Sequence, residues 1–303
     1  MTALDAFSRA HVEVNGARML VRRAGSGPAV LLLHGYPETH LAWRDVAPDL
    51  ATQFTLIAAD LPGYGDSLIS DDVSREPFSK RAMGRMLAEL MDVLGLSRFA
   101  VVGHDRGARA EYRLPLDFPQ RVAALAVLDV IPILDMADRL TYQTAGQMAH
   151  WLWLAQHSDV PERLIGLDPD LYVRHILEMW GGSRVIDASV IAEYVRCMRK
   201  PEVRRAISAE YQADQFDLAD DRADRANGRR IQAPVLAVWG KGGFAEQFGD
   251  PIAIWRNWAD QVSGRALACD HFMMEESPWE VSALLASFLV ETVAEARSIE
   301  RKS

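Results

Sequence analysis

The chain has 303 residues, of which 49% are hydrophobic, and carries a net charge of −9 at pH 7. This composition is typical of a globular protein and excludes a disordered chain, and the negative charge argues against a general binder of nucleic acids. Two cysteines, Cys197 and Cys269, are too few for a disulfide framework and fit a reducing compartment.

The N-terminus and the apolar runs predict where the protein works. The first residues show no basic stretch followed by an apolar one, so we expect no signal peptide. The apolar run at 122–128 is far too short to cross a bilayer. We therefore expect a soluble, cytoplasmic protein with neither a membrane nor a nucleic-acid partner.

In chain order, apolar segments between turn-forming residues predict alternating strands and helices. The expected strands are 17–23, 29–34, 54–59, 98–102, 122–128, 234–240 and 265–269, and the expected helices are 79–94, a segment from about 107, and 278–297. Such alternation favours an α/β protein with a mostly parallel central sheet flanked by helices. Residues 135–228 have little β-type patterning. We predict a core of 1–134 and 229–303, with 135–228 inserted as a helical cap.

The segment GHDRGARA directly follows an expected strand and carries the most informative motif. Gly103 and Gly107 frame Asp105 as glycines frame the serine of a Gly-x-Ser-x-Gly nucleophile turn. On its own, Asp105 could equally cap a helix. However, Asp129 and His271 also follow expected strands, and ligands of such sheets sit beyond the carboxyl ends of the strands. The order of the three is the nucleophile, acid, histidine order of the α/β-hydrolase fold.

The position of the acid has an alternative. The usual later site follows the strand at 234–240, where the loop offers Glu246 and Asp250, both displaced from the strand end. We expect Asp129 to be the acid of the triad, with Glu246 as the second choice.

Further motifs recur along the chain: LLLHGYPETHLAW, DLPGYGDS, GHDRGARAEYR, HWLWLAQ, EYQAD and DHFMMEESP. Together they resemble the haloacetate (fluoroacetate) dehalogenases of the α/β-hydrolase superfamily, over most of the chain. Several are common to α/β-hydrolases at large, HDRGAR is shared with epoxide hydrolases, and the HW pair is more discriminating. The resemblance implies a homodimer. Because no metal-ligand cluster or nucleotide-binding loop appears in the sequence, we expect neither a metal nor a cofactor.

The chemistry of this family explains the choice of residues. The carboxylate of Asp105 attacks an sp³ carbon, displaces the leaving group and forms an alkyl ester. His271, oriented by Asp129, then activates a water that attacks the ester carbonyl. By resemblance, the backbone N–H groups of Tyr36 and Arg106 stabilise the resulting oxyanion. Cys269 and Asp270 precede His271 where the family often has glycine.

Two arginines beside the nucleophile point to an anionic substrate. Arg106 and Arg109 are expected to hold the substrate carboxylate and to offset its repulsion from Asp105. A neutral substrate would not require them. The expected reaction is the hydrolysis of fluoroacetate or chloroacetate to glycolate and halide.

The resemblance assigns the leaving halide to three residues of the cap. His150, Trp151 and Tyr211 offer an imidazole, an indole and a hydroxyl group, all of which are neutral donors. Trp180 is expected to shape the substrate cavity.

Other functions of the same triad remain open. An epoxide hydrolase shares the triad but activates its substrate with two cap tyrosines, for which Tyr211 and, at best, Tyr142 are available. A haloalkane dehalogenase usually has tryptophan directly after the nucleophile, where this chain has Arg106. A non-catalytic relative would usually lack part of the triad.

Overall fold

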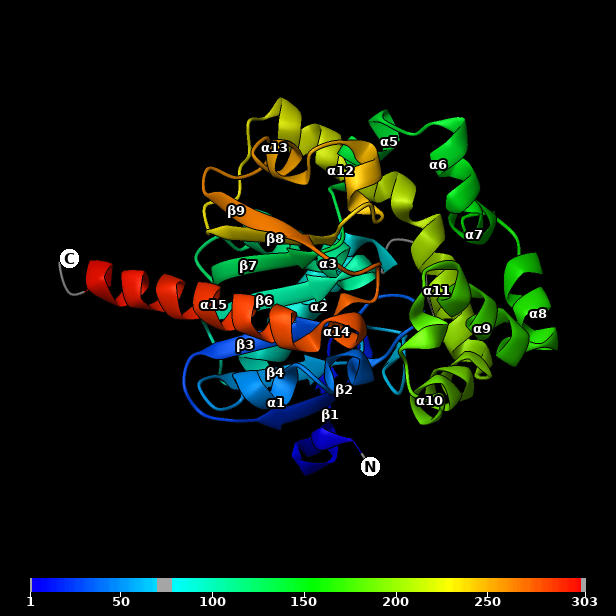
Figure 1. Cartoon of the computed structure of the whole chain (residues 1–303), viewed down its shortest axis with the longest axis horizontal. Coiled ribbons are helices and arrows are strands. Elements are labelled where there is room, and N and C mark those ends of the chain that lie inside the picture. Colours follow the sequence, from blue (N-terminus) through cyan, green and yellow to red (C-terminus); the bar gives the residue numbers. More distant parts are fainter. Residues whose placement is uncertain (1, 70–77, 301–303) are drawn as a thin grey trace.

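A twisted sheet of nine strands forms the centre of the computed structural model, which describes residues 2–69 and 78–300 (Figure 1). The strands are β1 (Ser8–Val14), β2 (Ala17–Ala24), β3 (Ala29–Leu33), β4 (Thr55–Ala59), β5 (Leu68–Ile69), β6 (Phe99–His104), β7 (Val122–Leu128), β8 (Val235–Gly240) and β9 (Val262–Leu267). Their order is β1-β2-β4-β3-β6-β7-β8-β9, with β5 paired to β2. The pairs from β4 to β9 are parallel, whereas β2 is antiparallel to its neighbours.

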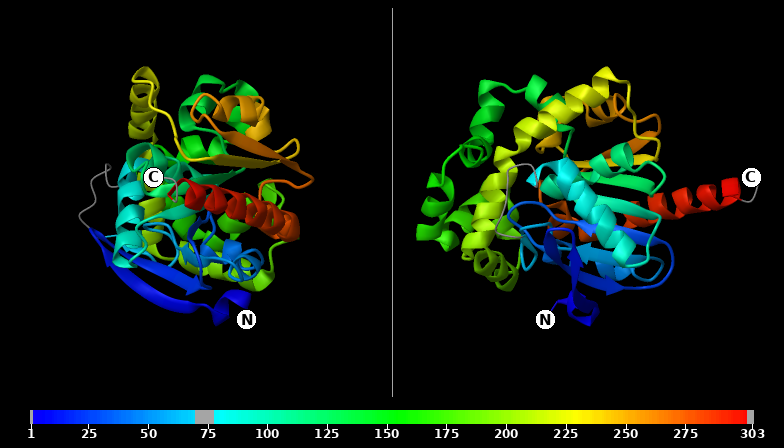
Figure 2. Two further views of the ribbon diagram at one scale, coloured as in Figure 1. Left: turned by 90° about the vertical axis from the view of Figure 1, so that its left-hand side faces the viewer. Right: turned by 180° about the vertical axis from the view of Figure 1, so that it is seen from behind.

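Helices cover both faces of the sheet. One face packs against α1 (Ala47–Leu50) and α15 (Pro278–Glu300), and the other against α2 (Lys80–Val93), α3 (Asp105–Glu111), α4 (Arg113–Asp117) and α13 (Pro251–Trp255). Figure 2 shows α2 crossing the sheet on the side opposite to α15. Short turns of helix lie between these elements: η1 (Ala3–Ala6), η2 (His40–Trp43), η5 (Ala245–Phe248) and α14 (Met273–Glu276).

A helical insertion, which we define as α5 to α12, connects β7 to β8. It consists of α5 (Ile133–Asp138), α6 (Tyr142–Gln147), α7 (Ala149–Leu154), α8 (Val160–Leu167), α9 (Pro169–Met179), η4 (Gly182–Arg184), α10 (Ala188–Met198), α11 (Pro201–Gln212) and α12 (Asp214–Ala226). Helices α7 to α11 lie at one end of the sheet (Figure 1). The exact boundaries of a cap at 135 and 228 remain a prediction.

Burial of the central strands on both faces explains why they read as continuous apolar runs. In β3, all five residues are buried, and successive side chains alternate between the two cores. Leu31 packs with the cluster on the α2 side, and Leu32 with the cluster on the α15 side. The predicted α/β fold with its mostly parallel sheet is therefore confirmed.

The differences from the expected elements have simple causes. Strand β1 escaped prediction because only Val12 and Val14 along it are buried, so it carries little apolar signal. The helix after the nucleophile begins at Asp105, earlier than expected, and ends at Glu111 before a new helix starts. Pro115 has no N–H to donate to the carbonyl of Glu111, which accounts for the break.

The close contact between α3 and β3 gives a testable prediction. A Cβ atom on Gly107 would lie 2.4 Å from the carbonyl oxygen of His34, so the backbones could not keep their spacing. We expect Gly107→Ala to lower the free energy of unfolding by about 1–3 kcal/mol, as overpacked cores do. Chemical denaturation would measure this loss.

The matched control is Gly146→Ala. Gly146 lies in α6, and a Cβ there would meet no atom within 4 Å. Alanine is the better helix former, so this variant should be unchanged or stabilised by up to about 1 kcal/mol. Equal stability of both variants would contradict the tight α3–β3 contact.

Candidate active site

The nucleophile turn joins β6 to α3 and places Asp105 in a strained backbone conformation. Asp105 has a φ of 46°, in the left-handed region that side chains other than glycine seldom adopt. The turn is tight because Gly103 and Gly107 allow close approach: a Cβ on Gly103 would lie 2.5 Å from the carboxylate of Glu111. At both positions of the motif, the neighbouring atoms therefore leave no space for a side chain larger than that of glycine.

The carboxylate of Asp105 lies where the sheet changes direction. The chain leaves β3 toward β4 and leaves β6 toward β7 on the other side, so the loops after β3 and β6 diverge and open a crevice. The backbone N–H of Tyr36, from the loop after β3, donates to Oδ1 of Asp105 at 2.9 Å. Burial alone would raise the pKa of Asp105, but the nearby His271 and His104 and the Tyr36 N–H hold it well below its usual range. The side chain is therefore an anion.

His271 and Asp129 form the second part of the site. Oδ2 of Asp129 is 2.7 Å from Nδ1 of His271, and both side chains are buried. Asp129 also has a positive φ, of 48°, and its Oδ1 accepts from the N–H of Ala245 at 3.3 Å. Glu246, the second choice for the acid, instead accepts from the N–H of Gly242. The structure thus brings Asp129, and not Glu246, to the histidine.

The charge state of His271 depends on the two carboxylates. Burial alone would lower its pKa, but the hydrogen bond and charge of Asp129, together with the charge of Asp105, raise the pKa to about 8. The imidazolium is therefore stabilised while Asp105 is an anion. Any event that neutralises Asp105 removes part of this stabilisation, lowers the pKa of His271 and increases the fraction of the imidazole that is neutral and can accept a proton.

His104 connects the three loops of the site. Its Nε2 lies 2.9 Å from the carbonyl oxygen of His271, and its Nδ1 lies 3.0 Å from the carboxylate of Glu38. Glu38 also accepts from the N–H of Gly35 at 3.0 Å, next to Tyr36. His104 therefore supports the geometry of the nucleophile, and Glu38 is a supporting residue that the sequence did not reveal.

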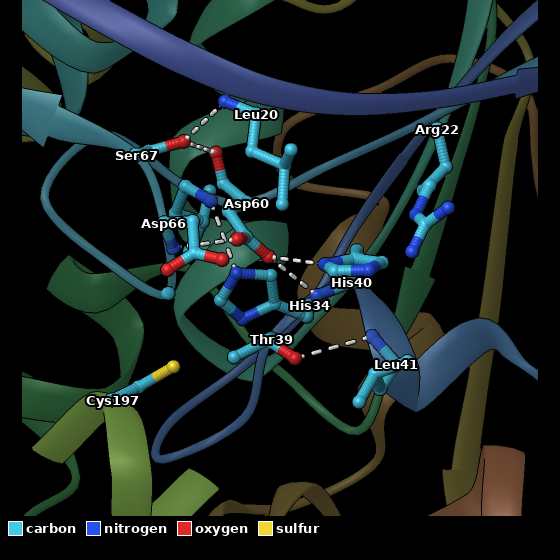
Figure 3. Close-up of polar contacts among 12 residues, drawn as sticks. Leu20, Arg22, His34, Thr39, His40, Leu41, Asp60, Asp66, Ser67 and Cys197 are labelled. Carbon is cyan, nitrogen blue, oxygen red and sulfur yellow. Dashed lines mark hydrogen bonds and ion pairs between the residues drawn. The ribbon is translucent and has the colours of Figure 1, made fainter. Parts of the chain in front are cut away.

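Asp60 holds the loop that presents Tyr36 (Figure 3). Its Oδ1 accepts from the N–H of His40 at 2.8 Å and lies 2.7 Å from Nδ1 of the same residue. Its Oδ2 accepts from the N–H of Asp66 at 2.8 Å, and its carbonyl oxygen accepts from Ser67 at 2.9 Å. The motif DLPGYGDS thus positions the loop after β3 without contributing to the cavity.

A small cavity of about 20 Å³ lies against Asp105, enough space for about one water molecule. Ten residues line it: Tyr36, Asp105, Met148, His150, Trp151, Ile176, Trp180, Tyr211, Phe244 and His271. A second cavity of about 320 Å³ shares Trp180, Phe244 and His271 with it. Trp180 thus lies between the two, with its ring centroid 5.4 Å from that of His271.

The three expected halide ligands all reach the small cavity. His150 stacks on Tyr36 with ring centroids 6.0 Å apart, and Nδ1 of His150 is buried without a hydrogen-bond partner among the described residues. Burial lowers the pKa of His150 to about 4, so the ring is neutral at pH 7. Trp151 and Tyr211 meet edge to face at 5.7 Å. The indole N–H of Trp151 donates to Asp214.

The two arginines differ in their partners and are absent from the residues that line the small cavity. Nε of Arg106 donates to Glu210 at 2.8 Å, and Nη2 donates to Asp214 at 3.0 Å. Arg109 donates to the carbonyl oxygen of Ile131 and contacts the sulfur of a methionine, each at 3.3 Å. For Arg106 to bind a further carboxylate, Glu210 or Asp214 would have to move, which the motif around Asp105 does not predict.

Both guanidinium groups stack on aromatic rings of the cavity wall. That of Arg106 lies 4.1 Å from the ring centroid of Tyr211 and 4.8 Å from that of Trp151, and that of Arg109 lies 4.5 Å from Trp151. Asp214 holds the pKa of Arg106 above its ordinary value despite burial. Burial and the neighbouring Arg106 lower the pKa of Arg109.

No group of three or more His, Cys, Asp or Glu side chains in residues 2–69 and 78–300 could hold a metal ion. Within the same residues, no helix is both long and apolar enough to span a membrane.

Comparison with known proteins places this geometry in a family. Residues 28–278 match the model of a family described as the alpha/beta hydrolase fold. The chain belongs to this α/β-hydrolase family. Asp105, Asp129 and His271 follow one another along the chain in the order nucleophile, acid, histidine that this fold uses for its catalytic residues.

The α/β-hydrolases that are similar to this chain are named for two different activities. A fluoroacetate dehalogenase from Burkholderia sp. is 34% identical and covers 98% of this chain and 99% of its own. A soluble epoxide hydrolase from Corynebacterium sp. is also 34% identical, over 88% of this chain and 91% of its own. A solved Pseudomonas aeruginosa structure described as a "putative epoxide hydrolase" is 42% identical with a TM-score of 0.92, covering 97% of this chain and 99% of that one. A variant of the latter has been solved with bound MFA.

The electrostatics of the site predict how His271 titrates. Asp105→Asn removes a negative charge that stabilises the imidazolium, so the pKa of His271 should fall below about 8. Asp129→Asn should lower it further, because the hydrogen bond to Nδ1 is weakened as well. The titration of the imidazole C–H signals by NMR measures both shifts, and His271→Gln identifies the signal. A pKa that rises in either variant would contradict this electrostatic account.

Proposed function

We propose that this α/β-hydrolase hydrolyses haloacetates to glycolate and halide through an ester on Asp105. The observation that supports the proposal is that the anionic carboxylate of Asp105 and three neutral donors of the helical insertion line the same small cavity. Similarity to a fluoroacetate dehalogenase over nearly the whole of both chains supports it.

The first step is a displacement at carbon. An oxygen of Asp105 attacks the carbon that bears the halogen, the carbon–halogen bond breaks, and its electron pair leaves with the halide. Because the nucleophile is already ionised, no base is needed here. His150, Trp151 and Tyr211 are proposed to donate to the departing halide, and Arg109 and Arg106 to hold the substrate carboxylate.

The second step hydrolyses the ester. Alkylation neutralises Asp105, which lowers the pKa of His271 and prepares it to take a proton from water. The hydroxide formed attacks the carbonyl carbon of Asp105, and the negative charge develops on the oxygen that receives the Tyr36 N–H. The bond between that carbonyl carbon and the glycolate oxygen breaks, and His271 returns its proton to this oxygen. Asp105, left as a carboxylic acid, then releases a proton to solvent and regains its carboxylate.

Epoxide hydrolysis is the second candidate, and one observation favours it. The charge of Arg106 is matched by two carboxylates, which lessens the attraction for an anionic substrate. The same Asp105 ester would form on ring opening. Against it, Tyr211 faces His150 in the cavity rather than a second tyrosine of the insertion.

The ester intermediate should accumulate when its hydrolysis is blocked. With chloroacetate, His271→Gln should release about one halide per protein and keep a carboxymethyl group on Asp105. Halide release and peptide mass spectrometry measure this, and Asp105→Asn should show neither. Full turnover by His271→Gln would contradict the role of the histidine. Diol from styrene oxide, with no halide from chloroacetate, would favour the epoxide hydrolase.

The halide assignment predicts an order among halogens. Fluoride is a poor leaving group and a strong acceptor, so its departure should depend most on preorganised donors. Trp151→Phe should therefore slow fluoroacetate by roughly 100- to 1000-fold and chloroacetate by much less. Halide release at saturating substrate measures both rates.

The control for this variant is Trp153→Phe in the same helix. Trp153 packs against Tyr172, with ring centroids 5.9 Å apart, and is not among the residues lining the small cavity. It should change neither rate by more than about twofold, since such changes are typical of positions away from the chemistry. Equal losses on both halogens in Trp151→Phe would mean that Trp151 only shapes the cavity.

A further inference from the structure

The carboxylate of Asp214 engages two donors that the proposed function assigns to the substrate. Asp214 is the first residue of α12, and it is buried. Its Oδ1 accepts from Nη2 of Arg106 at 3.0 Å. Its Oδ2 lies 3.5 Å from Nη1 of the same guanidinium and accepts the indole N–H of Trp151. One side chain thus contacts both a proposed carboxylate ligand and a proposed halide ligand.

A second buried carboxylate shares Arg106. Oε1 of Glu210 accepts from Nε of Arg106 at 2.8 Å and contacts the ammonium group of Lys80, and its other oxygen accepts from the hydroxyl of Tyr64. Two carboxylates therefore already face one guanidinium. An incoming haloacetate would be a third carboxylate around Arg106, in addition to the anion of Asp105, in a region of low dielectric constant where like charges repel strongly.

Arg109 presents a different situation. Its guanidinium donates to the carbonyl oxygen of Ile131 and contacts the sulfur of Met136, which are neutral acceptors. Its positive charge is therefore available to attract an anion. The guanidinium carbon lies 4.5 Å from the ring centroid of Trp151. Of the two arginines, Arg109 is the one whose charge can serve a substrate without displacing a carboxylate.

We propose that Asp214 determines substrate specificity by competing with the substrate carboxylate for Arg106 and with the halide for Trp151. A haloacetate must displace Asp214 from Arg106 to bind, whereas a neutral two-carbon halide such as a haloacetamide places no carboxylate beside Asp214. Asp214 therefore limits the preference for haloacetates that the two arginines create. This inference rests on the proposed function for its chemistry, but its binding component can be tested without turnover.

The kinetic test replaces Asp214 by asparagine, which keeps an acceptor for Arg106 and removes the charge. For chloroacetate, KM should fall by about tenfold because Arg106 becomes available to the substrate carboxylate, and kcat should not fall because the indole N–H of Trp151 becomes available to the halide. For chloroacetamide, KM should stay within about twofold, since no charge is involved. A KM for chloroacetate that is unchanged or higher would overturn the inference.

Asp217→Asn is the matched control. Asp217 lies one turn further along α12, is equally buried, and accepts the backbone N–H of Lys80 at 2.7 Å. The substitution is the same and, in assays at pH 9, it also removes a charge, because the pKa of Asp217 is raised by burial only to about 7. This carboxylate receives no hydrogen bond from Arg106 or Trp151 among the bonds of the described residues. Asp217→Asn should leave the ratio of the two KM values unchanged. If it lowers KM for chloroacetate as much as Asp214→Asn does, the effect is one of general charge, and Asp214 has no special role.

A binding measurement separates this inference from the proposed function. Acetate has the carboxylate but no leaving group, so calorimetric titration with acetate reports anion binding even if the protein releases no halide. Wild-type protein should bind acetate with a Kd weaker than about 1 mM, and Asp214→Asn about tenfold more tightly. This result without halide release from any substrate would refute the proposed function and retain the role of Asp214.

Wild-type protein decides the question if Asp214→Asn does not fold, as circular dichroism would show. Micromolar affinity of the wild type for acetate would overturn the inference. So would a wild-type kcat/KM more than about 100-fold higher for chloroacetate than for chloroacetamide, since a competing carboxylate would forbid such a preference.

Discussion

An ionised, half-buried carboxylate at Asp105 is the constraint on which the rest of the site depends. A buried charge is tolerated only where hydrogen bonds and opposite charges replace water. The sheet supplies these at its switch point, because the loop after β3 brings the Tyr36 N–H to one side and the loop after β9 brings His271 to the other. Asp60, Glu38 and His104 then hold those loops in place. The motifs LLLHGYPETHLAW, DLPGYGDS and GHDRGARAEYR therefore act together to position the carboxylate of Asp105.

Pairing of buried charges also holds the helical insertion against the core. Four aspartates on one buried face of α12, Asp214, Asp217, Asp221 and Asp224, meet groups of α2, α3 and α4. Asp221 and Asp224 pair with Arg113, and Asp217 accepts from the backbone of Lys80. Burial raises the pKa of Asp217 to about 7 and that of Asp221 to about 6. The helix that anchors the insertion thus also neutralises Arg106.

The sheet and the proximity of Asp105, Asp129 and His271 could be predicted from the sequence because both leave local patterns. Strands buried on both faces give continuous apolar runs, and the turn around Asp105 needs glycines where backbones touch. The burial of Glu210 and Asp214, the partners of Arg106, is much harder to predict from the sequence. Acids at 210, 214, 217, 221 and 224 recur with helical spacing, which is also what a solvated helix face shows. Only the placement of α12 against α2 and α3 reveals that these acids are buried. Strand β1 was missed because its exposed residues carry no apolar pattern.

Arg106 and Arg109 illustrate how far a motif determines a site. They lie three residues apart in α3, on one face of the helix, and the sequence gives both the same expected role. Their environments differ because α11 and α12 present carboxylates to Arg106, while α5 and the loop before it present a sulfur and a carbonyl oxygen to Arg109. The motif determines where each arginine lies on α3. The helical insertion supplies the groups that pair with each guanidinium, and so determines how much of its positive charge remains to attract a ligand. Under the proposed function, the helical insertion therefore determines substrate choice through the partners of these arginines, whereas the loops of the sheet supply the reacting groups.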